Sequence, residues 1–104
     1  MCVKYHRNRY VFIKYIGEDD RVFKLIKQKY IELYGIIKFS HSRMKLMRVF
    51  KENNIMVIRI DHKSTSNLLT TLKALVLNNI DISILGVSST LKKGIDKYIK
   101  TNLL

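Results

Sequence analysis

Apolar residues alternate with polar ones, or form short runs, in four stretches that predict β-strands. Residues 9–16 are rich in aromatic and β-branched side chains, which favours a strand. Residues 44–50 and 55–62 flank the polar stretch Lys-Glu-Asn-Asn, and this arrangement predicts a β-hairpin. Residues 80–87 predict the fourth strand.

Three other stretches space their apolar residues three and four apart, as an amphipathic helix does. The first follows a cluster of acids suited to a helix N-terminus and ends at Gly35. The second begins at Ser64 or Ser66, and the third begins at Ser89 or Thr90. Residues 36–43 are a basic connection without a clear period. The predicted buried positions of the three helices are Val22, Phe23, Ile26, Tyr30, Leu33 and Tyr34; Leu68, Leu69, Leu72, Leu75 and Val76; and Leu91, Ile95, Tyr98 and Ile99.

The chain order of these elements, β-α-β-β-α-β-α, predicts an α/β fold. Its first six elements match a ferredoxin-like, RNA-recognition-like α+β sandwich, in which two helices cover one face of a four-stranded antiparallel sheet. Residues 55–60 and 82–87 are apolar at both alternating positions, so both sheet faces need cover. We expect the additional C-terminal helix to cover the second face, with the N-terminal segment as a further candidate. At 104 residues, one domain is expected, residues 1–104 with a core over 9–100.

The charge balance narrows the class of partner. Twenty Lys and Arg against eight Asp and Glu give a net charge of +12, and a polyanionic partner would relieve the resulting self-repulsion. The cations recur along the whole chain, which favours nucleic acid over an acidic membrane surface. The single Cys2 excludes an internal disulfide, and the sequence has no apolar signal core and no run that could span a membrane. These features predict a soluble protein of the reducing cytoplasm.

The cationic residues fall into three groups: an N-terminal arm, a run from the basic connection through the second strand, and the last helix. Each group alone is explained equally well by a solvated surface. Three groups together, with so few acids, favour contacts to phosphate. The groups are Lys4, Arg7 and Arg9; Lys38, Arg43, Lys45, Arg48 and Lys51; and Lys92, Lys93, Lys97 and Lys100.

The sequence GVSSTLKKGI, residues 86–95, joins the fourth strand to the last helix. It suits a nucleophile, a helix cap or a phosphate cradle. The nucleophile is disfavoured because no histidine or acid lies near in sequence to activate Ser88 or Ser89, and no GxSxG pattern is present. Free N–H groups at a helix start favour an anion, and Lys92 and Lys93 lie where a cation is unfavourable for the helix itself. The cap and the cradle both stay open.

Candidates for catalysis and for base stacking are weak. The three histidines, His6, His41 and His62, lie far apart and have no metal-ligand spacing with Cys2. The neighbours Asp61 and His62 point to opposite faces of a strand and cannot act on one another. The third strand has no aromatic residue for stacking a base. The aromatic residues of the first strand are expected to serve mainly the core; they are Tyr10, Phe12 and Tyr15.

Three pieces of sequence, in their order and spacing, resemble a known family. They are the opening strand RYVFIKYI (residues 9–16), the hairpin and helix MRVFKENNIMVIRIDHKSTSNLLTTL (47–72) and the corner ILGVSSTLKKGIDKYI (84–99). Together they resemble the archaeal ribonuclease P protein component 2 family, which is related to a eukaryotic subunit shared by ribonucleases P and MRP. The likeness covers roughly residues 7–100, and Ser89 stands where many members have glycine.

The resemblance implies a subunit of the ribonucleoprotein that removes the 5′ leader from precursor tRNA. The RNA with bound Mg²⁺ is then the catalyst, and this subunit is non-catalytic and binds no cofactor itself. A second, TIM-barrel-like protein is the implied partner, often in a two-plus-two heterotetramer. RNA contacts are implied at the hairpin end and at the corner, and the cationic groups extend them. The candidate RNA-binding residues are Arg7, Arg9, Lys38, Arg43, Lys45, Arg48, Arg59, His62, Lys63, Ser88, Thr90, Lys92, Lys93 and Lys97.

Two enzymatic hypotheses compete with this one. A small metal-dependent nuclease of the ferredoxin-like, CRISPR-associated kind would use Asp19 or Asp20 as a Mg²⁺ ligand, although Gly17 and Glu18 separate these acids from the first strand. The start of a helix explains the acids more simply. A phosphate-ester or acyl-phosphate hydrolase would need an arginine in a glycine-rich loop at this position, and the acids of GEDDR give the wrong charge.

Overall fold

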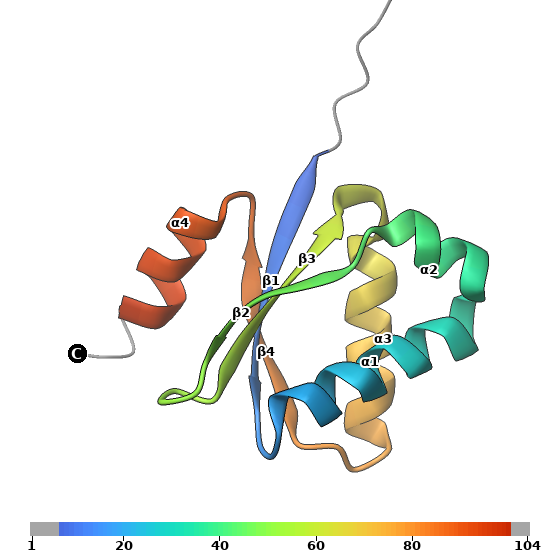
Figure 1. Ribbon diagram of the computed structural model, residues 1–104, viewed down its shortest axis with the longest axis horizontal. Coiled ribbons are helices and arrows are strands. Elements are labelled where there is room, and N and C mark those ends of the chain that lie inside the picture. Colours follow the sequence, from blue (N-terminus) through green and yellow to red (C-terminus); the bar gives the residue numbers. More distant parts are fainter. Residues whose placement is uncertain (1–6, 101–104) are drawn as a thin grey trace, which may run out of the picture.

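The computed structural model describes residues 7–100, which form a four-stranded sheet with helices on both faces (Figure 1). A 3₁₀ turn, His62–Ser64, precedes α3, and α4 continues as a π-helical segment, Ile95–Lys100. The strands are β1 (Asn8–Tyr15), β2 (Lys45–Phe50), β3 (Ile55–Asp61) and β4 (Ile82–Ser88); the helices are α1 (Asp19–Tyr34), α2 (Ile36–Ser42), α3 (Thr65–Leu77) and α4 (Leu91–Gly94). Within these residues, no helix has the length and apolar character that crossing a membrane requires.

The strands lie in the order β2-β3-β1-β4, and every neighbouring pair is antiparallel. This order, with α1 after β1 and α3 after β3, is the ferredoxin-like arrangement that the sequence predicted. The hairpin between β2 and β3 is also confirmed, and it turns through Asn54 in the left-handed region. The basic connection is in part a helix, α2, which the sequence did not predict.

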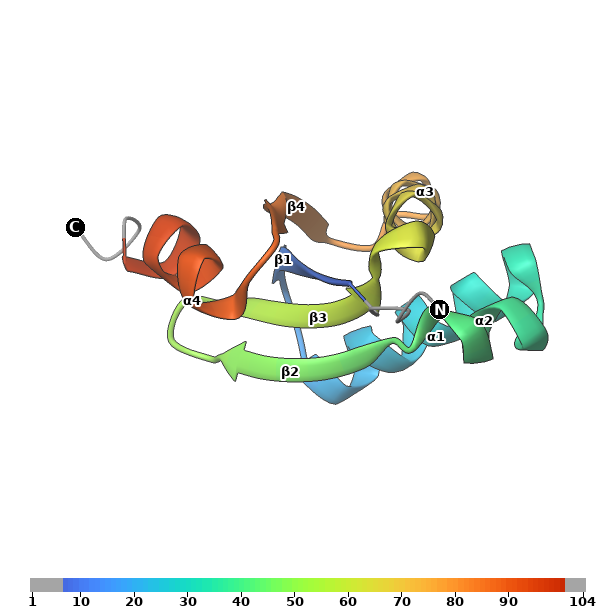
Figure 2. The same cartoon turned by 90° about the horizontal axis from the view of Figure 1, so that it is seen from above.

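The larger core lies between the sheet and the helices α1 and α3 (Figures 1 and 2). Alternate residues of the two central strands enter it, among them Val11, Ile13 and Ile58. The helices contribute Ile26 and Leu72, which are fully buried. Burial of these aliphatic side chains is the main stabilising term for this face of the sheet.

The helix stripes are largely confirmed, with two errors. Leu33 and Val76 were predicted to be buried but are 44% and 48% exposed. Each lies in the last turn of its helix. Ser64 directly precedes α3, as one alternative predicted, but its side chain makes no capping hydrogen bond. The Asp61 carboxylate instead accepts a bond from the Lys63 N–H at 3.1 Å and caps the 3₁₀ turn.

The second face of the sheet is covered by α4 and the π-helical segment, as the two-sided apolar pattern predicted. Phe12 and Val57 are fully buried there, beneath Leu91, Ile95 and Ile99. The rings of Phe12 and Tyr98 lie with centroids 5.1 Å apart. The N-terminal segment, residues 1–6, was the other candidate cover and lies outside the described residues.

Two glycines set how closely this helical segment approaches the sheet. A Cβ on Gly94 of α4 would overlap the ring of Phe12, and a Cβ on Gly86 of β4 would overlap the ring of Tyr98. Both backbones therefore sit where only glycine leaves room. These are the two glycines of the sequence GVSSTLKKGI, so that sequence serves first to dock the last helix.

Candidate nucleic-acid interface

Antiparallel pairing gathers most of the predicted RNA-binding residues at one end of the sheet. The start of β1 pairs with the ends of β3 and β4, and the start of β2 pairs with the end of β3. Residues that lie as far apart in sequence as Arg7 and Lys93 therefore flank the same edge. We call this region the basic end; it comprises Arg7, Arg9, Arg43, Lys45, Arg59, His62, Lys63, Ser88, Thr90, Lys92 and Lys93.

One row of paired residues crosses all four strands at the basic end. Ser88 of β4 pairs with Tyr10 of β1, which pairs with Arg59 of β3, which pairs with Lys45 of β2. The row lies on the same face as α4, because Tyr10 and Arg59 stand two residues from Phe12 and Val57, which α4 covers. It is thus the last row on the α4 face that crosses all four strands, and the pair Asn8–Asp61 lies one step further out on the two central strands. Tyr10 was not among the predicted RNA-contacting residues. Its pairing with Arg59 and Ser88 is what makes it a candidate.

A β-bulge brings a further cation to this face. Leu46 pairs with Ile58 and Arg48 pairs with Val57, so three residues of β2 match two of β3 around Met47. Strict alternation would place Lys45 and Arg48 on opposite faces, and the bulge puts both on the α4 face. Arg48 there lines a shallow cavity of about 380 Å³ together with Lys92 and Asp96 of the α4 segment.

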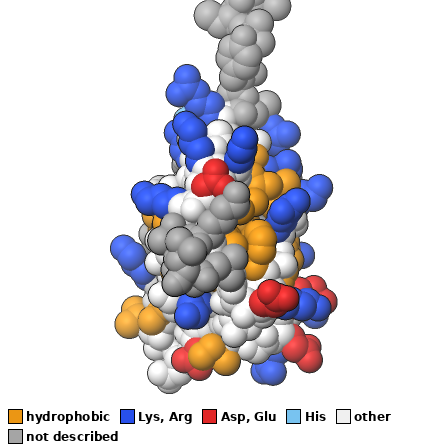
Figure 3. All heavy atoms as spheres, turned by 90° about the vertical axis from the view of Figure 1, so that its left-hand side faces the viewer, with side chains coloured by type: hydrophobic (Ala, Val, Ile, Leu, Met, Phe, Trp, Pro, Cys, Tyr) orange, Lys and Arg blue, Asp and Glu red, His pale blue; other side chains and the backbone are white. Residues whose placement is uncertain are grey.

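Six cations of the basic end are open to solvent and form no ion pair with a described residue. Arg7, Arg43, Lys45, Lys63 and the two lysines of α4 are exposed, and none forms an ion pair with a described residue. Figure 3 shows Lys and Arg side chains gathered in the upper half of the α4 side, whereas most visible Asp and Glu side chains lie lower. Clustered unpaired cations create a positive potential that attracts a polyanion.

Two polar atoms within the basic end are buried without a hydrogen-bond partner among the described residues. They are Nε of Arg59 and Nδ1 of His62. Arg59 itself is half-buried in this row, so its guanidinium lies partly within the protein surface and has less freedom than an exposed arginine. A guanidinium that is restricted in this way presents its remaining donors in a defined direction, which suits a phosphate oxygen.

Two predicted contact residues lie away from the basic end. Lys38 is exposed on α2, on the opposite side of the sheet from α4. Lys97 lies in the π-helical segment, where its Nζ is 5.4 Å from the centre of the Tyr98 ring. Among the wider cationic groups, Lys51 lies in the hairpin at the far end of β2, and Lys4 and the side chain of Lys100 lie outside the described residues.

The corner between β4 and α4 is built by hydroxyl hydrogen bonds. Thr90 is the N-cap of α4, and its Oγ1 accepts a bond from the Lys93 N–H at 3.2 Å. The Ser88 hydroxyl donates to the Thr90 carbonyl at 2.7 Å, and its oxygen lies 3.4 Å from the Thr90 N–H. Of the two predicted caps, Thr90 is therefore correct and Ser89 is not. The phosphate cradle stays a prediction.

We expect Thr90→Ala to lower the free energy of unfolding by about 1 kcal/mol, because the Lys93 N–H loses its capping acceptor. Thr90→Ser keeps a hydroxyl acceptor and should stay close to the parent protein. Ser89→Ala, one residue earlier on an exposed side chain without a capping bond, is the matched control. Urea denaturation measures all three, and equal midpoints for Thr90→Ala and Ser89→Ala would contradict the cap.

The acids that the nuclease hypothesis requires lie at the other end of the sheet. Asp19 and Asp20 occupy the first turn of α1, as the helix-start interpretation predicted. Among the described residues, no three His, Cys, Asp or Glu side chains come close enough to hold a metal ion. Burial raises the pKa of Tyr15 above its ordinary value, and the nearby Asp19 carboxylate raises it further.

Comparison with known proteins assigns the family. The Rpp14/Pop5 family model matches residues 9–99, which is most of the chain. The chain belongs to the Rpp14/Pop5 family. The match runs from the start of β1 through the α4 segment, so it includes every element that forms the basic end.

The fold of this Rpp14/Pop5 family member is also found in a solved structure. One chain of a cryo-EM structure of yeast ribonuclease MRP is similar at 13% sequence identity, with a TM-score of 0.55 and 98% of each chain covered. At this identity the likeness establishes the shared fold. No curated protein sequence matches the chain.

Proposed function

We propose that this protein is an RNA-binding subunit of a ribonuclease P or MRP ribonucleoprotein, and that it binds the RNA through the basic end. The observation that carries the proposal is the convergence of cations from separate segments onto one end of the sheet, where none of them forms an ion pair with an acid of residues 7–100. Membership of the Rpp14/Pop5 family and the fold shared with a chain of ribonuclease MRP support it.

The geometry favours contacts to the RNA backbone over stacking on unpaired bases. In an RNA-recognition domain the open sheet face presents aromatic rings to bases. Here α4 covers that face, Phe12 is fully buried beneath it and Tyr15 points into the other core. What stays accessible is the row that crosses the four strands at the basic end, where Arg59 and Lys45 offer charged donors to phosphate.

In the proposed assembly this subunit does not perform the chemistry. It neutralises phosphates, stabilises the fold of the RNA and lowers the Mg²⁺ concentration that the RNA needs, while the RNA and its Mg²⁺ cleave the 5′ leader from precursor tRNA. The protein itself holds no cofactor in this proposal. A second protein subunit, TIM-barrel-like and in a two-plus-two arrangement, completes the particle.

Reconstitution tests the function. Precursor tRNA is incubated at limiting Mg²⁺ with the cognate RNA alone, with this protein alone, and with both together, in the presence and absence of the second subunit. We expect leader removal only where the RNA is present, and we expect the protein to lower the Mg²⁺ concentration at half-maximal rate. The proposal would be overturned if the protein alone removed the leader and kept this activity after any co-purified RNA had been digested. That result would favour the metal-nuclease hypothesis. For that case, the Asp19→Ala, Asp20→Ala variant identifies the acids responsible.

A further inference from the structure

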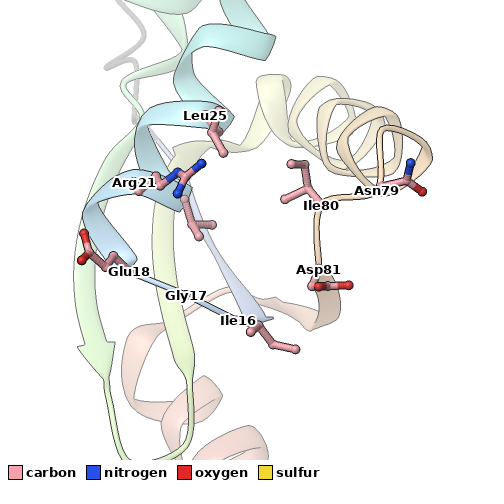
Figure 4. A pocket seen from close by; sticks show the side chains of 9 residues that line it. Ile16, Gly17, Glu18, Arg21, Leu25, Asn79, Ile80 and Asp81 are labelled. Carbon is pink, nitrogen blue, oxygen red and sulfur yellow. The ribbon is translucent and has the colours of Figure 1, made fainter.

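The end of the molecule opposite the basic end holds a cavity of about 400 Å³ (Figure 4). One wall is the first turns of α1, with Val22 and Leu25, and the other is the segment before β4, with Ile80. The backbone N–H of Ile16 donates to the carbonyl of Asp81 at 3.2 Å and ties the end of β1 to the start of β4. Because both walls are anchored to the sheet, the cavity is a preformed feature of the fold.

Large aliphatic side chains are exposed around this cavity. Ile16, at its rim, is 71% exposed, and Leu77, at the end of α3, is 83% exposed. These are the two most exposed of the large hydrophobic side chains among the described residues. Val76, beside Leu77, is 48% exposed. A cavity with a mixed apolar and charged lining and exposed aliphatic neighbours is typical of a surface that another molecule covers.

The charge at this end is opposite in sign to the rest of the protein. Glu18 and Asp81 line the cavity, and Asp19 and Asp20 follow in the first turn of α1. These four acids are half of the chain's eight. Arg21 also lines the cavity and Lys14 lies nearby, so this end carries −2 in a chain of net charge +12. We call it the acidic end, defined by Ile16, Glu18, Asp19, Asp20, Val76, Leu77 and Asp81. Its charge disfavours RNA phosphate.

We propose that the acidic end docks a cationic protein surface, one of whose apolar side chains enters the cavity while neighbouring lysines or arginines meet the carboxylates of Glu18 and Asp81. Neither carboxylate has an ion pair with a described residue, so both are available to a partner. A buried apolar anchor surrounded by complementary charge supplies both the affinity and the orientation of such a contact.

A second copy of this chain fits the acidic end less well. Two acidic ends placed face to face would repel one another. A basic end docked on an acidic end makes a head-to-tail contact that does not close and covers the RNA-binding residues. A different protein that also contacts the RNA is cationic itself, and it can bind here while the opposite end holds the RNA. That the partner is another subunit of the same ribonucleoprotein rests on the proposed function.

Defined peptides test the docking surface without RNA. The probe is a capped pentapeptide with one phenylalanine between two pairs of lysines, titrated into the isotope-labelled protein and followed by NMR. We expect saturable shifts of the backbone amides of Ile16, Arg21, Ile80 and Asp81. A peptide with serine in place of phenylalanine, and a peptide with glutamates in place of lysines, should each bind at least tenfold more weakly.

Two charge-matched variants localise the effect. Asp81→Lys should weaken binding of the lysine-phenylalanine peptide at least fivefold. Glu52→Lys changes the charge equally on an exposed hairpin residue at a distance from the cavity, and should leave peptide binding unchanged. Both variants should bind RNA at least as tightly as the parent protein. Failure of RNA binding with intact peptide docking would therefore count against the proposed function alone.

Several outcomes overturn the docking proposal. They are the absence of saturable shifts at these amides, equal binding of the serine peptide, and equal weakening by the two variants. Shifts of the same amides on adding an RNA oligonucleotide would assign the surface to RNA. Shifts that depend on the concentration of the free protein would assign it to a second copy of the chain.

Discussion

Replacing Lys45, Lys63 and Lys92 with glutamate is expected to abolish most of the RNA affinity. The three side chains are exposed and come from β2, from the 3₁₀ turn and from α4, so the fold should tolerate their change. If each loses one charged contact of about 1.5 kcal/mol, the dissociation constant rises on the order of 1,000-fold. The slope of log affinity against log salt should also fall by roughly three, since about one counterion is released for each phosphate contact.

The matched control separates the position of charge from its amount. Replacing Lys14, Lys24 and Lys73 with glutamate changes the net charge by the same six units on exposed residues of β1, α1 and α3, away from the basic end. We expect a loss of affinity of less than about tenfold, from the weaker overall field alone. Filter binding or fluorescence anisotropy at several salt concentrations measures both variants. Equal losses would mean that the basic end has no special role.

Gly94→Ala is expected to loosen the last helix from the sheet. The new methyl group would overlap the ring of Phe12, which is fully buried and has no space into which it can turn. Overpacking of this kind costs about 1–3 kcal/mol, which in a domain of this size lowers the melting temperature by roughly 4–8 °C for each kcal/mol. Because α4 also carries Lys92 and Lys93, we expect RNA affinity to fall with it.

A double-mutant cycle tests the cause of this instability. The atoms of Phe12 that a methyl on Gly94 would meet are Cε1 and Cζ, and leucine has neither. Phe12→Leu alone should destabilise the protein by leaving space in the core. In that background Gly94→Ala should cost much less than in the parent protein, which gives a coupling energy of about 1 kcal/mol or more. Additive effects in thermal denaturation would contradict the close contact.

The secondary structure was largely predictable because the strands and the long helices are governed by local pattern. Residues 55–60 are apolar at both alternating positions, and the structure buries them from both sides, with Arg59 alone half-exposed. How much of a helix is buried depends instead on which other elements pack against it. Leu33 and Val76 continue an apolar stripe into the last turn of a helix, where they are exposed.

The helix α2 shows where periodicity fails. Its first residues, Ile36 and Ile37, are 63% and 70% exposed, so its apolar residues do not mark a buried face. The helix is held by a ring contact to α1 and by burial of its last residue instead. The ring of Phe39 packs against Tyr30, and Ser42 is fully buried, with its hydroxyl donating to the Phe39 carbonyl. Neither contact has a signature in the local sequence.

The candidate site was predictable as a set of residues but not as a surface. Composition and the corner motif identified the cations, whereas the register of the strands decides which of them meet. The bulge around Met47 puts Lys45 and Arg48 on one face, and the sequence of β2 alone does not predict this bulge. The pairing of Tyr10 with Arg59 is likewise a long-range contact, because it joins residues that lie far apart in the chain.

The bulged strand β2 also lies at an open edge of the sheet. An unpaired edge strand offers its backbone N–H and C=O groups to any other extended chain, and a row of such strands can grow into an aggregate. The irregular backbone around Met47 interrupts that row of groups, and two repelling cations, Lys45 and Arg48, flank it. The bulge that places both cations on one face thus also disfavours edge-to-edge pairing between molecules.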